Sequence, residues 1–262
     1  MAGRPPDNGQ RPETHQGSDT EQRGGPAQTK AQTNAQAMAQ TIMTAAETVA
    51  QGDDGRLCSP SATRNAGAIG EALFRLLAGR TGTLIEIGSG TGQHAASIAP
   101  GLPSICWLPT EYREAQLASI VAWCAQAGAS NVRQPRRLDA AADWASDLAV
   151  DGTLAAMSPI AAVFASNVIH IAPWRVAEGL ITGAGKVLAA GGMLLLYGPY
   201  REGGRHTGEG NARFDATLKA RDPDWGVRDL EAVANLARTA GFGAPAITRM
   251  PANNLLLAFT RL

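Results

Sequence analysis

The stretch Leu84-Ile85-Glu86-Ile87-Gly88-Ser89-Gly90-Thr91-Gly92 decides the fold of this chain. It begins as a short apolar run that is typical of a buried strand. It then passes one acid and ends in three glycines spaced G-x-G-x-G. Glycine adopts backbone conformations with positive φ and lets a ligand lie against the main chain, because it has no Cβ. A strand followed by such a loop is typical of the first strand of a doubly wound sheet, where a nucleotide-like ligand needs this close approach.

The spacing of the glycines excludes the most common dinucleotide loop. The fingerprint G-x-G-x-x-G requires a glycine at position 93, where this chain has Gln93, and the acid Glu86 is no part of it. The sequence E-x-G-x-G-x-G instead resembles the cofactor loop of S-adenosylmethionine (SAM)-dependent methyltransferases of the Rossmann-like class. This resemblance implies that SAM is the cofactor and that Glu86, Gly88, Ser89, Gly90 and Gly92 form its site. A purely structural turn is the alternative.

Composition narrows the class of protein and of partner. Of 262 residues, 44% are hydrophobic, and 23 basic side chains balance 23 acidic ones. The zero net charge argues against nucleic acid as an obligate electrostatic partner. No run approaches the roughly 18 apolar residues of a membrane span, so we expect no membrane partner.

The three cysteines bear on the redox compartment of the protein rather than on a metal or disulfide site. Cys58, Cys106 and Cys124 show neither C-x-x-C spacing nor the spacing of histidine ligands. We therefore expect no metal site and no disulfide framework, and the usage fits a reducing cytoplasm.

The first forty residues differ from the rest of the chain. Residues 1–41 contain no Val, Ile, Leu or aromatic residue, so they have too little apolar surface to offset the entropy of ordering. We predict a disordered tail over 1–41 and a single domain over 42–262. The segment Ala35–Ala50 has apolar residues at helical spacing, which favours a short amphipathic helix.

From Ser59 onward the pattern alternates between helix and strand. The predicted helices cover Ala66–Ala78, a segment opening near His94, Glu114–Gln126, Trp174–Ala189 and Asp229–Thr239, with Asp229 helping to satisfy the free N–H groups of the last helix. The predicted strands are Thr83–Gly88, Ile105–Pro109, Val132–Leu138, Ile160–Ser166, Met193–Gly198, Ile247–Met250 and Leu255–Thr260.

This order of elements predicts the fold class. Five strand–helix steps followed by a strand pair indicate an α/β protein with a seven-stranded, mostly parallel sheet and an antiparallel hairpin at one edge. The methyltransferase resemblance implies the strand order 3-2-1-4-5-7-6, with the last strand antiparallel.

Acidic residues follow the second and third predicted strands, and ligands bind at the carboxyl ends of the strands in such sheets. Glu111 can accept hydrogen bonds from both hydroxyls of a ribose. Its alternative role is that of an acid at the start of the following helix. Asp139 can accept from an adenine amino group, with a helix N-cap as its alternative.

Two residues that flank the glycines have less defined roles. Glu86 either anchors the loop or reaches the cofactor's ammonium group indirectly, and the sequence leaves both readings open. His94 follows the loop directly, and we expect it to cap or pack near the methionine end of the cofactor.

A narrower resemblance covers about three quarters of the chain, from Ser59 to the C-terminus. The segments that carry it are Ser59–Asn65, Ser89–His94, Ser166–Trp174, Tyr197–Tyr200, Arg221–Gly226 and Met250–Asn254, with His206, Thr207, Asn211, Phe214 and Asp215 between them. They resemble the methyltransferase-like family known as domain of unknown function 938, which includes relatives of methyltransferase-like protein 26. The resemblance implies a SAM-binding fold and names no substrate. The chain departs from it at Arg201 and Arg205, and this departure bears on substrate choice.

Residues after the fourth and fifth strands are expected to form the acceptor pocket. The predicted catalytic residues are Asn167, His170 and Tyr197, and the predicted substrate contacts are Arg64, Asn65, Trp174 and Tyr200. His170 is the candidate general base, because an unperturbed imidazole titrates near pH 6.5. A structural hydrogen-bonding role is its alternative. The aromatic residues either line the acceptor or belong to the core, and Asn253 and Asn254 are expected to form a turn.

These residues favour methyl transfer to a small-molecule O, N or S acceptor by in-line displacement. Methylation of a nucleic-acid base is disfavoured, because Val168-Ile169 replace the two prolines typical of that class. Protein methylation is a further minor alternative. A SAM-binding module without chemistry, acting as a partner subunit, is the main one. A nicotinamide oxidoreductase is disfavoured by Gln93 and by the lack of a Tyr-x-x-x-Lys pair. The sequence leaves the oligomeric state open.

Overall fold

The computed structural model describes residues 49–51, 54–157 and 159–262. The predicted tail over 1–41 and most of the helix predicted over Ala35–Ala50 lie outside these residues. The last two residues of that helix prediction are described, and the prediction is wrong there, because Val49 and Ala50 belong to strand β1 (Val49–Gln51). This strand pairs with β2 (Leu57–Cys58) in an antiparallel ribbon.

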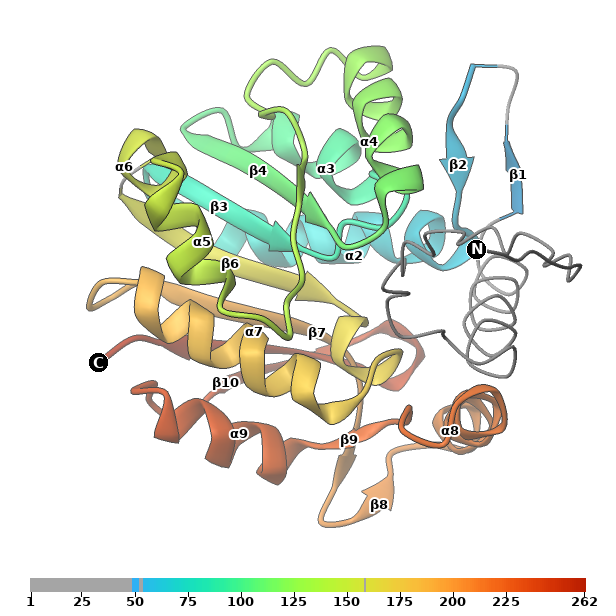
Figure 1. The fold of residues 1–262 in the computed structure, drawn as a ribbon. Coiled ribbons are helices and arrows are strands. Elements are labelled where there is room, and N and C mark those ends of the chain that lie inside the picture. The colour runs from blue at the N-terminus through green and yellow to red at the C-terminus, as the bar shows by residue number, and fades with distance from the viewer. Residues whose placement is uncertain (1–48, 52–53, 158) are drawn as a thin grey trace, which may run out of the picture. The chain divides into compact units, whose positions relative to one another are not determined.

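A twisted central sheet organises the domain (Figure 1). Its main strands are β3 (Gly82–Ile87), β4 (Ile105–Glu111), β5 (Arg136–Arg137), β6 (Ile160–Ser166), β7 (Met193–Glu202), β10 (Ala246–Met250) and β11 (Asn254–Thr260). They lie in the order β5-β4-β3-β6-β7-β11-β10, and β11 is antiparallel to both of its neighbours. The predicted α/β fold, the order 3-2-1-4-5-7-6 and the antiparallel edge hairpin are confirmed.

Helices cover both faces of this sheet (Figure 1). The helices are α2 (Pro60–Leu76), α3 (Gln93–Ile98), α4 (Glu114–Gln126), α5 (Trp144–Val150), α6 (Thr153–Met157), α7 (Trp174–Val187), α8 (Glu209–Arg221) and α9 (Leu230–Thr239). Because strand residues alternate between faces, the core divides in two. Leu84, Trp107 and Phe164 pack with α2 and α3, whereas Ile85 and Val163 pack with α5, α7 and α9.

The third predicted strand is much shorter than expected. The prediction of Val132–Leu138 is wrong, because only Arg136–Arg137 form a strand there, with one isolated bridge between Trp107 and Val132. Proline lacks the N–H that a strand ladder needs, and Pro135 stands between that bridge and the strand.

The fifth predicted strand is longer than expected, because β7 runs on to Glu202. Its extension pairs with β8 (Arg205–His206) and β9 (Arg228–Asp229). This small extra sheet lies at the carboxyl end of β7, where substrates bind in folds of this kind.

Helix boundaries show two further differences. α2 begins at Pro60 rather than Ala66, because Ser59 caps it by accepting a hydrogen bond from the Ala62 N–H. Asp229 stands at the N-cap of α9 but makes no capping hydrogen bond with its side chain, which pairs instead with Arg201. The expected capping role of Asp229 is therefore wrong.

Helices α5, α6 and α8 were not predicted from the sequence. α8 carries few apolar residues, and only Asn211, Asp215 and Leu218 on it are buried, so it has little apolar periodicity. Among the helices of the described part of the chain, none is both long and apolar enough to cross a membrane.

Candidate functional site

The glycine loop connects β3 to α3 at the point where the strand order reverses, with β4 on one side of β3 and β6 on the other. Gly88, Gly90 and Gly92 all have positive φ, at 69°, 57° and 93°. A Cβ added at Gly88 meets the Val168 side chain at 2.7 Å, and one at Gly92 meets the Ile120 Cα at 2.5 Å. A Cβ at Gly90 has no heavy atom within 4 Å. Gly88 and Gly92 therefore permit internal packing, whereas Gly90 faces open space.

Glu86, near the end of β3, anchors the glycine loop through side-chain hydrogen bonds. One carboxylate oxygen, Oε2, accepts hydrogen bonds from the Ser89 hydroxyl at 2.8 Å and from the Trp107 indole N–H at 3.0 Å. The side chain is 1% exposed, and this burial raises the pKa of Glu86 to about 7, although the two hydrogen bonds act in the opposite direction. Of the two roles open from the sequence, loop anchoring is the one for which these contacts account.

His94, at the start of α3, lies beside Glu86. Its Nδ1 is 3.9 Å from the other carboxylate oxygen, and its ring packs edge-on against Phe164. Burial lowers the pKa of His94 to about 4. The imidazole is therefore neutral at pH 7, and its contact with Glu86 is not an ion pair.

Glu111 ends β4 and ties the second strand to the glycine loop. Its Oε2 accepts a hydrogen bond from the Gly90 N–H at 2.8 Å, and its Oε1 accepts from the Arg113 N–H at 3.1 Å. The residue is 7% exposed. Each carboxylate oxygen has two lone pairs, so both retain capacity to accept from a ligand hydroxyl. The structure thus brings Glu111 beside Gly90, the open position of the loop.

Gln93 makes contacts at the glycine loop that its sequence position did not predict. In the sequence, it stands out mainly because the dinucleotide fingerprint has a glycine at this position. Its Oε1 accepts hydrogen bonds from the Ser59 N–H at 2.6 Å and from the Thr91 hydroxyl at 2.7 Å. Its Nε2 donates to the Thr63 hydroxyl at 2.7 Å. Gln93 therefore joins the glycine loop to the first turn of α2. The polar run Ser59–Thr63 was the only signal in the sequence for this contact.

Asp139 lies apart from the glycine loop, after β5. It is exposed, and its Oδ1 accepts a hydrogen bond from the Ala141 N–H at 2.9 Å. The nearest following helix, α5, is capped by Asp143 instead. Asp139 thus forms a local turn rather than the N-cap that was its alternative role, and it lines a small cavity of about 110 Å³ with Arg137. Its contact with adenine stays a prediction.

Asn167 follows β6 and lies beside Tyr197, in the middle of β7. The Asn167 N–H donates to the Tyr197 carbonyl at 2.8 Å. Asn167 has a φ of 62°, in the left-handed region that asparagine tolerates better than most residues. This conformation turns the chain out of β6 and into the segment that carries His170.

The Tyr197 hydroxyl belongs to a hydrogen-bonded group that was not predicted. It accepts from the Asn254 side-chain amide at 2.8 Å, next to the turn between β10 and β11. In that turn, the Asn253 carbonyl accepts from the Asn211 side-chain amide at 3.0 Å. Asn211 also donates to the Thr207 hydroxyl at 2.9 Å. The start of α8 is thereby linked, through the β10–β11 turn, to the middle of β7.

His170 lies on the opposite face of the sheet from this group. It is fully buried, and its ring packs edge-on against Tyr200, with 4.9 Å between ring centroids. A Cβ at Gly198 is 2.4 Å from its Nε2. Burial, with a smaller effect of the Arg228 charge, lowers the pKa of His170 to about 3. This placement argues against the predicted general base, because a base must reach the acceptor's proton.

Arg228 clamps the segment around His170, and sequence reasoning missed it. Its backbone N–H donates to the His170 Nδ1 at 3.3 Å, and its guanidinium donates to the carbonyls of Ile169 and Ala172 at 2.9 and 2.7 Å. The guanidinium also lies 5.7 Å from the centre of the Trp174 ring. Trp174 is half-buried at the start of α7. Tyr200 and His170 are fully buried, and Tyr197 is only 2% exposed. The predicted contact of Tyr200 with substrate stays a prediction.

Arg64 and Asn65 lie on the second turn of α2, where Arg64 is exposed and Asn65 is half-buried. Through Gln93 this helix is fixed to the glycine loop. Their contact with substrate stays a prediction.

Comparison with known proteins identifies the family. A family model described as protein of unknown function, DUF938, matches residues 56–261. The chain belongs to this family. The match includes the glycine loop, the Tyr197 group and the His170 segment described above.

Solved structures place this DUF938 chain in a known fold. The apo form of the SAM-dependent methyltransferase SibL matches with a TM-score of 0.60 and 18% identity, over 77% of this chain and 55% of SibL. An O-methyltransferase family protein from Burkholderia thailandensis matches with a TM-score of 0.58 and 17% identity, over 88% of this chain and 69% of that protein. Human N-acetylserotonin methyltransferase in complex with SAM matches with a TM-score of 0.56 and 14% identity, over 77% of this chain and 52% of the human protein.

At these identities the likeness shows the fold alone, which is that of SAM-dependent methyltransferases. The DUF938 chain spans little more than half of the length of SibL and of the human protein.

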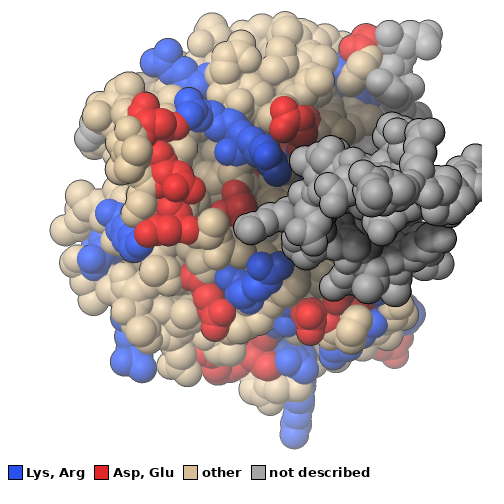
Figure 2. All heavy atoms as spheres, viewed as in Figure 1, with Lys and Arg blue, Asp and Glu red and all other residues tan. Residues whose placement is uncertain are grey.

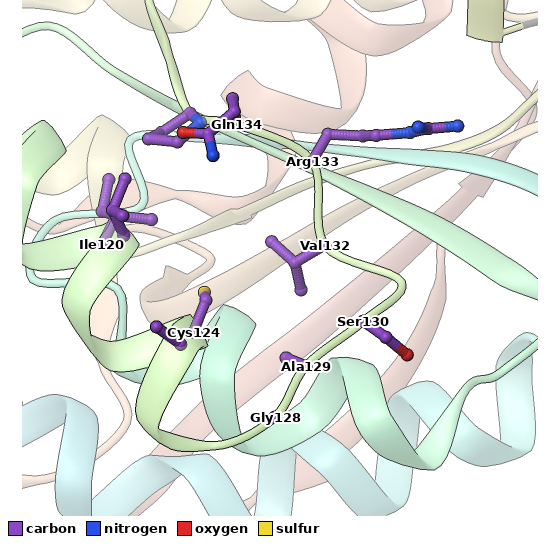
Figure 3. A pocket seen from close by; sticks show the side chains of 11 residues that line it. Ile120, Cys124, Gly128, Ala129, Ser130, Val132, Arg133 and Gln134 are labelled. Atoms are coloured by element: carbon purple, nitrogen blue, oxygen red, sulfur yellow. The ribbon is translucent and has the colours of Figure 1, made fainter.

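The surface of the DUF938 chain adds two observations. On the face drawn in Figure 2, acidic and basic side chains are interspersed. A cavity of about 350 Å³ lies between α4 and the segment 128–135 that leads to β5 (Figure 3). Its lining is mostly apolar and includes Ile120, Cys124 and Val132. None of the predicted site residues lines this cavity, so it is separate from the candidate site.

Proposed function

We propose that this DUF938 chain is a SAM-dependent methyltransferase that acts on a small-molecule O, N or S acceptor. One observation carries the proposal. At the switch point of the sheet, Gly90 faces open space while its N–H is bound by the carboxylate of Glu111. A loop with no side chain at its open position, next to an acid with free lone pairs, fits a nucleoside whose ribose has two hydroxyls.

Residues on two strands would hold this cofactor. The glycine loop, anchored by Glu86 and Ser89, offers close backbone approach, and Glu111 accepts from the ribose hydroxyls. His94 and Asn167 border the methionine side, and Asp139 is the proposed acceptor for the adenine amino group. When bound, the cofactor supplies a methyl group on a cationic sulfur, which is already activated for displacement.

The chain's own residues then position the acceptor and exclude water. Tyr197, in the middle of β7, lies beside Asn167 at the end of β6, and the turn at Asn254 and the start of α8 are proposed to close this side. With His170 buried behind Gly198, catalysis rests on proximity and desolvation rather than on a histidine base. Arg64, Asn65 and Trp174 are proposed to contact the substrate from α2 and α7.

The neighbours support a small acceptor, since one of them is named for its action on N-acetylserotonin. The balanced charge of the chain supports the absence of nucleic acid from its partners. All three cysteines are free, which supports the proposed cytoplasmic location.

A second candidate is a SAM-binding partner subunit without chemistry of its own. The observation that favours it is the complete burial of His170 and Tyr200, which removes two of the polar groups expected at the acceptor.

Calorimetry and a transfer assay test both candidates. We expect the full chain to bind SAM and S-adenosylhomocysteine (SAH) and to prefer both to NAD. A panel of phenols, thiols and amines with methyl-labelled SAM then separates enzyme from subunit. Tighter binding of NAD than of SAH contradicts both candidates. SAH binding without transfer to any compound in the panel favours the subunit.

A further inference from the structure

We infer that the acceptor atom is an anionic oxygen or sulfur that receives a hydrogen bond from the Tyr197 hydroxyl, whose direction is fixed by Asn254. This inference rests on the proposed function and names the substrate class for the same site. It assigns Asn254 as a positioning residue that acts through Tyr197.

The register of the sheet places Tyr197 level with the glycine loop. Glu86 of β3 pairs with Phe164 of β6, and Ser166 of β6 pairs with Tyr197 of β7. Tyr197 therefore lies in the row of Gly88, two strands away, at a distance of about 10 Å between backbones. Its side chain shares the sheet face of Phe164 and Trp107, which is also the face of α2 and α3. Tyr197 thus borders the proposed cofactor loop on the acceptor side.

Among the described residues, the Tyr197 hydroxyl makes one hydrogen bond, as an acceptor, and its own hydrogen is left for a further partner. A phenol hydroxyl can accept through its oxygen and donate its single hydrogen. The Asn254 side-chain N–H already donates to this oxygen at 2.8 Å. The hydroxyl hydrogen is therefore available to a bound acceptor in a site where Tyr197 is only 2% exposed, and the atom that accepts it must carry a lone pair.

Asn254 is itself held by an unusual turn. The two residues before it, Ala252 and Asn253, both have left-handed backbones, with φ of 58° and 57°. Such conformations are costly for residues other than glycine and persist only where surrounding contacts require them. Here the contacts are those of Asn211 from α8 with the Asn253 carbonyl. The third left-handed residue other than glycine in the described part of the chain is Asn167, whose N–H binds the Tyr197 carbonyl. One of these three residues thus binds Tyr197 directly, and the other two directly precede Asn254, which does.

No histidine in the described part of the chain is placed to remove a proton from the acceptor. His170 is fully buried on the far face of the sheet. His94 is buried beside Glu86, and its pKa is lowered to about 4. His206 lies on the β8 extension, with its Nε2 3.2 Å from the carboxylate of Asp215. A donor without a histidine base beside it suits a nucleophile that has already lost its proton.

The chemistry balances without proton transfer by the protein. The anionic oxygen or sulfur forms a bond to the methyl carbon, and the bond from that carbon to the cationic sulfur breaks. Its electron pair stays on the sulfur, which leaves as a neutral thioether. A protonated amine has no lone pair with which to accept from Tyr197, so amines are disfavoured as acceptors.

A coloured phenol tests the inference without turnover. The probe is 4-nitrophenol, with 4-nitrothiophenol as the sulfur counterpart, added to the full chain saturated with SAH. Both change their absorbance on ionisation. We expect binding to enrich the ionised form of at least one of them, as seen in the absorbance at a pH where the free probe is partly ionised.

Two variants remove the donor in different ways. Tyr197→Phe deletes the hydroxyl, and Asn254→Asp replaces the N–H donor by a carboxylate oxygen that draws the hydroxyl hydrogen away from the acceptor. We expect each to weaken binding of the ionised probe about 10- to 100-fold, because a charge-assisted hydrogen bond is lost. Tyr200→Phe is the matched control, since its hydroxyl is buried against His170 on the other face. It should leave probe binding unchanged.

The outcomes separate this inference from the proposed function. SAH affinity should be unchanged in all three variants, and a wild-type chain that binds no SAH contradicts the proposed function itself. SAH binding with ionised-probe affinity equal in wild type, Tyr197→Phe and Asn254→Asp overturns the inference. Binding of neither probe to the SAH complex also overturns it, as does preferential binding of a protonated amine such as benzylamine.

Discussion

The two sides of the candidate site are built in different ways. On the cofactor side, the contacts link residues close in sequence: Ser89 binds Glu86 three residues earlier, and Gly90 binds Glu111 after 21 residues. On the acceptor side, Tyr197 and Asn254 are 57 residues apart. The contacts of the glycine loop with Glu86 and Glu111 are therefore encoded in one βαβ unit, whereas the acceptor side is assembled from distant segments.

This difference teaches which half of such a site is free to vary. The glycine loop is constrained by backbone packing at Gly88 and Gly92, where a Cβ has no room. The acceptor side is set by side-chain contacts among β7, α8 and the β10–β11 turn, and single substitutions there alter the pocket without disturbing the sheet. We therefore expect mutations on the cofactor side to affect binding of every SAM analogue, and those on the acceptor side to affect only the acceptor.

The largest expected effect is that of Gly90→Val on SAM affinity. The new side chain projects from the open position of the loop, and a β-branched residue is strained at a φ of 57°. We expect affinity for SAM and SAH to fall more than about 100-fold, which corresponds to about 2.7 kcal/mol. Calorimetry measures this loss.

Gly79→Val is the matched control for that variant. Gly79 also has a positive φ, of 71°, and a Cβ there meets nothing within 4 Å. It follows α2 at the opposite end of the strands, so it carries the same backbone strain without touching the loop. Equal loss of SAM affinity in both variants contradicts the assignment of Gly90 to the cofactor site.

The next largest effect is that of Glu111→Ala. It removes the carboxylate that binds the Gly90 N–H and that is proposed to accept from the ribose. Loss of charge-assisted hydrogen bonds costs about 1.5–3 kcal/mol, so SAM should bind about 10- to 150-fold more weakly. Asp139→Ala should weaken SAM binding less than Glu111→Ala does, because the Asp139 side chain is exposed and accepts a hydrogen bond only from the nearby Ala141 N–H within the described residues. Wild-type affinity of Glu111→Ala contradicts the ribose role.

Much of the fold was predictable because its signals are local. The apolar run Ile160–Ser166 and the helix Glu114–Gln126 have the predicted limits, because the sequence pattern changes clearly at both ends of each. α8 was missed because its contacts are polar and made to distant segments, through Asp215 and Asn211. Propensity and periodicity carry no information on such contacts.

The candidate site was also predictable only in part. Glu86, Ser89 and Glu111 do gather around the glycine loop, because the carboxyl ends of neighbouring strands meet at one edge. The face on which a strand-end residue lies depends on register, which the sequence did not provide. The sequence therefore did not reveal that His170 and Tyr197, both expected at the acceptor, lie on opposite faces of the sheet.

On the face of the sheet opposite the Tyr197 hydroxyl, Gly198→Ala should reduce stability. Its Cβ falls 2.4 Å from the Nε2 of the buried His170, whose ring is held by Tyr200 and Arg228. Overpacking of this kind costs about 1–3 kcal/mol, measured by denaturant unfolding. Gly67→Ala, in the open middle of α2, is the control and should be neutral or slightly stabilising. An unchanged unfolding free energy for Gly198→Ala indicates that His170 is free to move.

A smaller effect is the pH dependence of SAM binding. The pKa of Glu86 is raised to about 7 in the absence of ligand. A bound cation favours the carboxylate, so SAM should bind about two- to tenfold more tightly at pH 8 than at pH 6. Glu86→Gln should remove this dependence, and SAH, which lacks the sulfonium charge, should show less of it. A flat profile for the wild type contradicts a site for the cationic cofactor beside Glu86.

The same residue links pH to stability with a definite sign. Because the folded state raises the pKa of Glu86 from 4.5, the protonated acid favours folding. Its contribution is complete below about pH 4.5 and is lost as the pH rises to 7. His94 acts in the opposite direction, since its lowered pKa makes folding more favourable as the pH rises from about 4 to 6.5. Comparing the unfolding of Glu86→Gln with that of wild type at pH 5 and 8 isolates the contribution of Glu86, and the remaining pH dependence includes His94 and the buried His170.

The smallest expected effect is that of deleting residues 1–34. This segment contains no Val, Ile, Leu, Phe, Tyr or Trp, so it has almost no apolar surface with which to dock on either side of the site. The thermal midpoint and the affinity for SAH should therefore match those of the full chain, as measured by calorimetry. The acceptor probe gives a more sensitive test, because the acceptor side is the one assembled from distant segments. If deletion weakens 4-nitrophenol binding while SAH affinity is kept, residues 1–34 contribute to the acceptor side, and the prediction of a tail without contacts is wrong.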